Sequence, residues 1–190
     1  ASRCAHAQEC FAELAREDAQ DAQLIVTNHA LLAIDAIDGV PMLPDYGAVI
    51  VDEAHELAAR VTQASTDELD SGLVERAARR ARLQTKGSAA DDLTDASDAL
   101  NDVLVRMDEG RIDTIDESLQ DVLALIRDSA RACLSDFPKE DGKSEPDAAR
   151  QQARGMVDDV RKIADRMAAK HETEVLWMSA GQRDKRLHIA

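Results

Sequence analysis

Apolar residues recur at helical spacing through the middle of the chain. Four stripes of this kind run over Leu69–Ala81, Leu100–Met107, Ile112–Phe137 and Ala153–Met167, in steps of three and four residues. Such stripes predict amphipathic helices that each bury one face. Because they follow one another with short breaks, they favour antiparallel helices packed as a bundle of about four.

Local signals refine the expected helix boundaries. Thr114-Ile-Asp-Glu117 is a capping box, and Ser144-Glu-Pro-Asp147 places proline in a first helical turn, where its missing N–H does no harm. Breaks between helices are expected at 85–90, around Gly110 and at 138–146.

The two ends of the chain have a different pattern. Helices are expected over 8–22, 29–37 and from Ala54 to Val61, and short β-branched or buried runs predict strands at 24–28, 47–51, 174–179 and 186–190. Alternating strands and helices indicate an α/β fold with a parallel sheet. The fold class predicted is therefore α/β, predominantly helical by residue count, with a parallel sheet interrupted by a helical insertion.

Composition agrees with a helical majority. The chain of 190 residues is 44% hydrophobic but only 2% aromatic, so its core must consist of Ala, Leu, Val and Ile. Its net charge of −15 repels a phosphate backbone, so contact with nucleic acid requires a local basic patch. Without a long apolar run or an apolar leader, the chain is expected to be soluble and cytoplasmic, with no membrane partner.

An acidic motif follows the second predicted strand. Four apolar residues, 48–51, precede Asp52-Glu53-Ala54-His55. Hydrolysis of ATP requires Mg²⁺ beside the β- and γ-phosphates and a carboxylate that activates water, and ligands collect where parallel strands end. We expect Asp52 to hold Mg²⁺-ATP, Glu53 to activate the water and His55 to sense the γ-phosphate. The alternative is an acidic pair that only favours the start of a helix.

The phosphate-binding loop that should accompany this motif is not recognisable. Gly142-Lys143-Ser144 matches the end of G-x-x-x-x-G-K-[ST], but Phe137 stands where the first glycine is required and no strand precedes it. We interpret this stretch as a connecting loop. The sequence is therefore expected to begin after the phosphate loop of a longer protein.

Three cysteines exclude a fully paired disulfide framework. Cys4 and Cys10 are separated by five residues just before a predicted helix, which suggests metal binding. Two thiolates do not complete a tetrahedral site or an iron–sulfur cluster, which requires four ligands. His6 is expected to be a surface residue. Cys133 continues a helical stripe and is expected in the core.

Three stretches carry a resemblance to a known family: CAHAQECFAELAREDAQDAQLIVTNHALLAID, YGAVIVDEAHEL and, after the helical region, VLWMS. In this order they resemble the DinG/XPD family of iron–sulfur superfamily II DNA helicases, especially its bacterial DinG branch. The resemblance implies an ATP-driven 5′→3′ helicase of DNA repair or replication that acts on single-stranded or forked DNA.

The resemblance also implies roles for individual residues and boundaries for the domains. It implies that Cys4 and Cys10 are two of four ligands of a 4Fe–4S cluster, that Asp52 and Glu53 are the Mg²⁺ and base residues, and that residues 63–173 are the Arch insertion. Residues 1–62 would be the end of the iron–sulfur region and part of a truncated motor domain 1, and 174–190 its return strands.

The family's phosphate loop, first two cluster cysteines, later ATPase motifs and second motor domain have no counterpart in this sequence. We therefore expect the piece alone to be inactive and to hold no stable cluster. The alternatives are an acidic helical protein-interaction module without a catalytic role, or part of a helicase-like single-strand exonuclease.

Two further features have competing interpretations. Asn28 in the Thr-Asn-His stretch lies on the DNA-facing side in the family, but we favour a helix cap. Arg76, Arg79 and Arg80 share a helix face that is able to contact phosphates of a single strand, although basic helix faces are usually solvated.

Overall fold

The computed structural model describes residues 9–37, 42–138, 148–170, 172–181 and 185–190. The chain divides into two compact units, Ala1–Thr66 and Asp67–Ala190. We call them unit 1 and unit 2 and describe each by itself.

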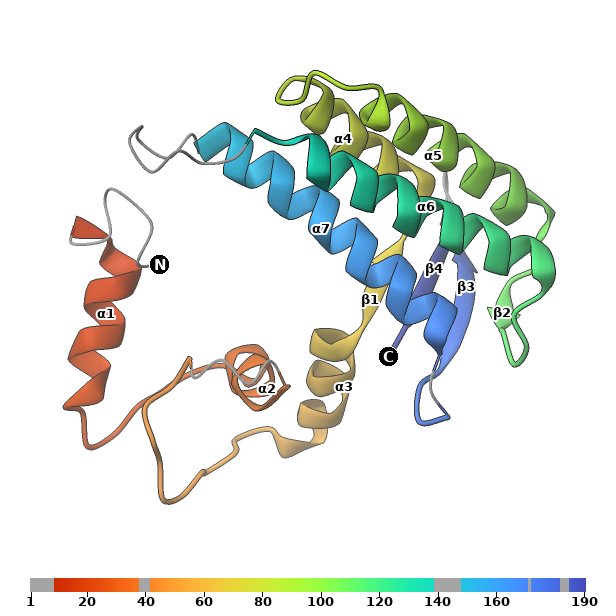
Figure 1. The fold of residues 1–190 in the computed structure, drawn as a ribbon. Coiled ribbons are helices and arrows are strands. Elements are labelled where there is room, and N and C mark those ends of the chain that lie inside the picture. Colours follow the sequence, from red (N-terminus) through yellow and green to blue (C-terminus); the bar gives the residue numbers. More distant parts are fainter. Residues whose placement is uncertain (1–8, 38–41, 139–147, 171, 182–184) are drawn as a thin grey trace. The chain divides into compact units, whose positions relative to one another are not determined.

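Unit 2 is built around four helices: α4 (Ser71–Arg82), α5 (Ala89–Arg106), α6 (Glu117–Asp136) and α7 (Ala148–Ala169). Helix α5 packs between α4 and α6, and α7 packs against both α6 and α4 (Figure 1). The predicted bundle of about four helices is confirmed.

A small sheet completes unit 2. Its strands are β1 (Asp67–Leu69), β2 (Gly110–Arg111), β3 (Leu176–Ala180) and β4 (Lys185–Ile189), in the order β1-β4-β3-β2. The strands expected at 174–179 and 186–190 are confirmed, but all pairs are antiparallel. The parallel sheet predicted from the sequence is therefore wrong for the described strands. A short connection joins β3 to β4, and only antiparallel neighbours can be joined so directly.

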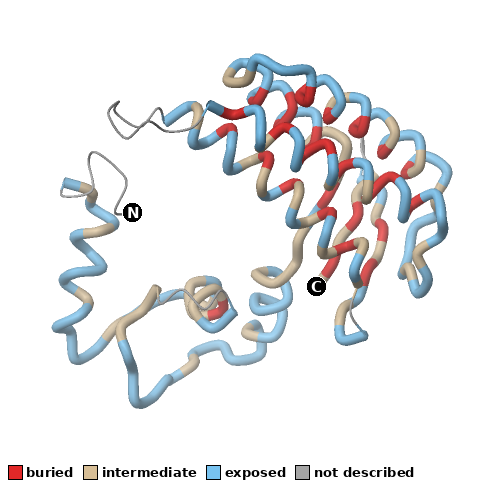
Figure 2. The backbone as a smooth tube through the Cα atoms, in the orientation of Figure 1, coloured by how far each residue is buried: buried red, intermediate tan, exposed pale blue. Residues whose placement is uncertain are grey.

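The core of unit 2 lies between the helices and one face of this sheet. Leu93, Leu123 and Val157 from the helices and Leu187 from β4 are fully buried. Figure 2 shows the buried residues along the inward sides of these elements. As the composition predicted, this core is almost entirely aliphatic.

The start of α6 differs from the prediction. The capping residue is Asp116, whose Oδ1 accepts a hydrogen bond from the Leu119 N–H at 2.7 Å, and not Thr114. Before it, Ile112 lies in extended backbone, where its N–H donates to the Leu176 carbonyl at 2.8 Å. The stripe continues past the helix because Ile112 and Ile115 still pack against the core. The second start signal, 144–147, lies outside the described residues.

Unit 1 contains α1 (Phe11–Gln20), α2 (His29–Ile37) and α3 (Ala54–Ser65), of which α2 and α3 pack together. The expected helices are thus present, but the expected strands at 24–28 and 47–51 are not. A β-branched run becomes a strand only beside a hydrogen-bonded neighbour, and the described part of unit 1 provides none. Across both units, no described helix has the length and apolar character that crossing a membrane requires.

Candidate functional site

The acidic motif lies at the start of α3. Asp52 and Glu53 form a turn after segment 48–51, which has no regular secondary structure, and the helix begins at Ala54. Glu53 has φ 49° and ψ 44°, the left-handed conformation, which is uncommon for residues other than glycine. Among the described residues, it is the single non-glycine residue with a positive φ.

Hydrogen bonds hold this turn and connect it to α2. The Glu53 N–H donates to Asp52 Oδ1 at 2.9 Å, and His29 Nε2 donates to the Asp52 carbonyl oxygen at 2.9 Å. Asn28 Oδ1 accepts from the Leu31 N–H at 2.8 Å, so the predicted cap at Asn28 is confirmed. Sequence reasoning missed the contact of His29, which joins the Thr-Asn-His stretch to the acidic motif.

The acidic side chains are open to solvent. Glu53 Oε2 lies 3.4 Å from His55 Nδ1, with 67% and 74% of the two side chains exposed, and Asp52 is also exposed. Within the described ranges, no three or more His, Cys, Asp or Glu side chains gather as a metal site. Two carboxylates fit Mg²⁺ held jointly with phosphates and water, which is the usual binding mode of this ion.

The cysteines do not gather into one site in the part of the chain that the structure describes. Cys10 is half-buried and precedes α1, while Cys4 and His6 lie outside the described residues. Cys133 is fully buried in α6, and burial raises the pKa of its thiol to about 11. The prediction that Cys133 is a core residue is confirmed. Since a cluster requires four ligands, the thiols of this chain do not fit a complete iron–sulfur centre.

Arg76, Arg79 and Arg80 are exposed on α4. Arg79 Nη2 lies 2.6 Å from Glu75 Oε1, and Arg80 Nη1 donates to Gln152 Oε1 on α7 at 2.8 Å. Two of the three guanidinium groups therefore already contact neighbouring side chains.

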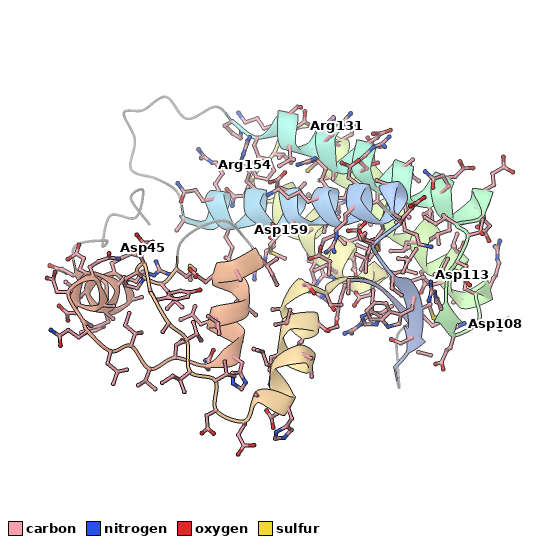
Figure 3. All side chains as sticks on the ribbon, turned by 90° about the horizontal axis from the view of Figure 1, so that it is seen from below. Asp45, Asp108, Asp113, Arg131, Arg154 and Asp159 are labelled. Atoms are coloured by element: carbon pink, nitrogen blue, oxygen red, sulfur yellow. The ribbon has the colours of Figure 1, made fainter. Side chains whose placement is uncertain are left out.

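Acids and bases are interspersed over the rest of unit 2. Figure 3 shows Asp113 near the start of α6, and Arg131 and Arg154 toward the opposite end of the α6–α7 pair. Arg111 Nε lies 2.7 Å from Asp113 Oδ1, and Arg131 Nη1 lies 3.9 Å from Asp128 Oδ1. In these described pairs an acid offsets each base, so the pairs do not add up to a continuous basic patch.

The sheet face away from the core carries a cluster that sequence reasoning missed. The rings of Trp177 and His188 stack at 5.0 Å with a 9° angle between their planes. His188 Nε2 is hydrogen-bonded to Ser179 Oγ at 2.7 Å, and its Nδ1 lies 3.6 Å from Glu68 Oε1. Burial lowers the pKa of His188, and Arg186 adds to this, against the opposing effect of Glu68. A sequence signal for this cluster existed: buried positions alternate with positions on the outer face in the two predicted strands.

Comparison with known proteins gives a partial match to a helicase. No protein-family model matches the chain. A stretch of 118 residues, 62% of the chain, is 42% identical to proteins described as ATP-dependent helicase DinG from Mycobacterium tuberculosis and from Mycobacterium bovis. The match covers 18% of the length of each relative. The chain is thus similar to a limited part of these helicases, and the resemblance to the DinG branch is supported to that extent.

Proposed function

We propose that this chain is part of an ATP-dependent 5′→3′ DNA helicase of the DinG/XPD family, in which Asp52 and Glu53 serve ATP hydrolysis. The observation that carries the proposal is the 42% identity to ATP-dependent helicases over 118 residues. The exposed acid pair at the start of α3 supports it, because carboxylates there are accessible to a metal-bound triphosphate.

Each side chain of the motif receives a role. Bound Mg²⁺ neutralises charge on the β- and γ-phosphates of ATP. Asp52, whose Oδ1 accepts the Glu53 N–H, would hold the metal, directly or through water. Glu53 accepts the proton of the attacking water. His55, 3.4 Å from the Glu53 carboxylate, orients it and senses the γ-phosphate.

The domain organisation of the proposal follows the family. Residues 1–62 form the end of an iron–sulfur region and part of motor domain 1, residues 63–173 an Arch-like insertion, and residues 174–190 the return strands. The four long helices of unit 2 all fall within the proposed insertion. Cys4 and Cys10 supply at most two of the four ligands of a 4Fe–4S cluster, so no step of the function proposed for this chain depends on the cluster.

Single-stranded or forked DNA is the proposed nucleic-acid partner. With a net charge of −15, this chain must rely on local cations to contact phosphates. Arg76, Arg79 and Arg80 are our candidates for such contacts. Arg79 and Arg80 would have to exchange Glu75 and Gln152 for phosphate oxygens.

A second candidate is an acidic helical module that binds other proteins without catalysis. The observation that favours it is the well-packed core of unit 2, which is formed entirely by residues of that unit. For the exonuclease alternative, the described residues provide no supporting group of metal ligands.

The test is the ATPase activity of the complete protein that contains this sequence, with and without single-stranded DNA. Replacing a catalytic base costs about 10²–10⁴-fold in rate, so Glu53→Gln should lower kcat by that factor. Glu56→Gln is the matched control, since Glu56 lies in the first turn of α3, directly after Glu53, is exposed and pairs with Arg60. Wild-type protein without ATPase activity, or Glu53→Gln with full activity, would favour the interaction module instead.

A further inference from the structure

The peptide between Asp52 and Glu53 is held at both of its polar ends. Its carbonyl oxygen accepts a hydrogen bond from His29 Nε2, and its N–H donates to Asp52 Oδ1, each at 2.9 Å. Because a peptide unit is planar, fixing its C=O and N–H fixes the orientation of the whole plane.

This peptide is followed by strained backbone. The left-handed conformation of Glu53, with φ 49°, is sterically disfavoured for a residue with a side chain. Such a conformation persists only where the surroundings hold it. The rotation about N–Cα of Glu53, measured from the clamped plane, sets the direction in which its side chain leaves the backbone.

His29 is well placed to be the fixed side of this clamp. It is the first residue of α2, is half-buried and lies 23 residues before Asp52 in the sequence. The Asn28 cap anchors the same turn of α2. A carbonyl oxygen can only accept, so His29 must carry its proton on Nε2.

We propose that His29 is a positioning residue, which clamps the Asp52–Glu53 peptide and so aims the Glu53 carboxylate at the water that attacks ATP. The inference rests on the proposed function, since it names a further residue of the same site. His29 acts through the backbone and touches neither nucleotide nor water.

The first experiment compares His29→Ala with His29→Gln in the complete protein. A misplacement of about 1 Å costs on the order of 10²-fold in rate, so His29→Ala should lower kcat about 10–100-fold with little change in KM for ATP. The Gln side chain retains an N–H donor and should restore part of kcat. Ala36→Ser, at an exposed position near the end of α2, is the control and should match wild type.

The second experiment needs no activity and uses the 190-residue chain. In ¹⁵N–¹H spectra, His29→Ala should shift the Glu53 amide resonance strongly, and His29→Gln should shift it less. An unchanged Glu53 resonance in His29→Ala would overturn the inference even in an inactive protein.

The outcomes separate the two proposals. If Glu53→Gln abolishes ATPase activity while His29→Ala has wild-type kcat, the clamp is wrong and the proposed function stands. If Glu53→Gln leaves activity unchanged, the proposed function itself fails. Equal losses in His29→Ala and His29→Gln with a lowered unfolding temperature would show a merely structural role and also overturn the clamp.

Discussion

The two units differ in how far their apolar side chains are buried. Unit 2 buries Leu, Ile, Val and Met side chains from four helices and three strands in one continuous core. In the described part of unit 1, Ala33 is the buried hydrophobic residue, whereas Ile50, Val26 and Leu24 are 97%, 90% and 80% exposed. Unit 2 therefore contains its own stabilising core, and unit 1 presents apolar segments that its described residues leave uncovered.

This difference follows from the sequence patterns. Each long apolar stripe packs against stripes on other helices of the same unit, so the four helices bury one another's apolar faces. A short apolar strand needs a hydrogen-bonded neighbour on at least one edge as well as packing on its faces. Segments 24–28 and 47–51 have strand composition without either, and they are irregular and mostly exposed instead. The described residues of unit 1 thus leave these apolar side chains largely open to solvent.

The largest expected effect is the loss of a buried leucine from unit 2. Leu123 in α6 is fully buried, so Leu123→Ala should lower the free energy of unfolding by about 2–5 kcal/mol through lost burial and a residual cavity. Urea denaturation followed by circular dichroism at 222 nm measures it.

Two exposed residues provide matched controls. Leu125 on the same helix is 46% exposed, and Ile50 in unit 1 is 97% exposed. Replacing either by Ala should change the free energy of unfolding by no more than about 0.5 kcal/mol. A large cost at Ile50 would break the contrast between the units, because it would show that this side chain is buried in solution.

A smaller effect is expected at the start of α6. Asp116→Ala removes the side chain that accepts from the Leu119 N–H, which should cost about 0.5–2 kcal/mol of unfolding free energy. Thr114→Ala should be nearly neutral, since Thr114 is exposed and precedes the cap by two residues. Comparable losses in the two variants would restore the capping box that the sequence predicted. The same urea titration serves for both.

That cap illustrates what sequence reasoning could and could not find in the fold. The helices of unit 2 were predictable where their stripes run for several turns, although the stripe predicted for α5 covers only the second half of that helix. The return strands were predictable from their short apolar runs. The exact start of α6 was not, since Thr114 and Asp116 are both good capping residues and only the pairing of Ile112 with Leu176 settles where extended backbone ends. Sheet direction was missed because the strands and helices at the two ends of the chain were assigned together to one parallel sheet, whereas the return strands pair with each other and with β1 and β2.

The candidate site shows the same limit. Asp52, Glu53 and His55 were recognisable from their order alone. The bond from His29 to the Asp52 carbonyl depends on how α2 lies against α3, and no local pattern reports it. The left-handed turn at Glu53 was equally hidden, because glycine is the residue that normally signals such a backbone.

The smallest expected effect concerns His188 on the sheet face of unit 2. Trp177 stacks on its ring, and Ser179, Glu68 and Arg186 are the polar and charged groups around it. Because burial lowers the pKa of His188 below its ordinary value of 6.5, the unfolded chain binds a proton there more readily than the folded chain. The stability contributed by neutral His188 should be fully present above pH 6.5 and be lost as the pH falls through the lower folded pKa.

His188→Phe keeps a ring for Trp177 to stack on but removes the titration. The other four histidines are the same in both proteins, so the difference between wild type and variant isolates His188. We expect wild type to lose more unfolding free energy than the variant between pH 7.5 and pH 5. Trp177 is the chain's one tryptophan, so its fluorescence during urea denaturation reports directly from the stack. Parallel pH profiles would mean that His188 has the same pKa in the folded and the unfolded chain. The outer sheet face would then resemble the exposed surface of unit 1 in its contact with water, and not the core beneath it.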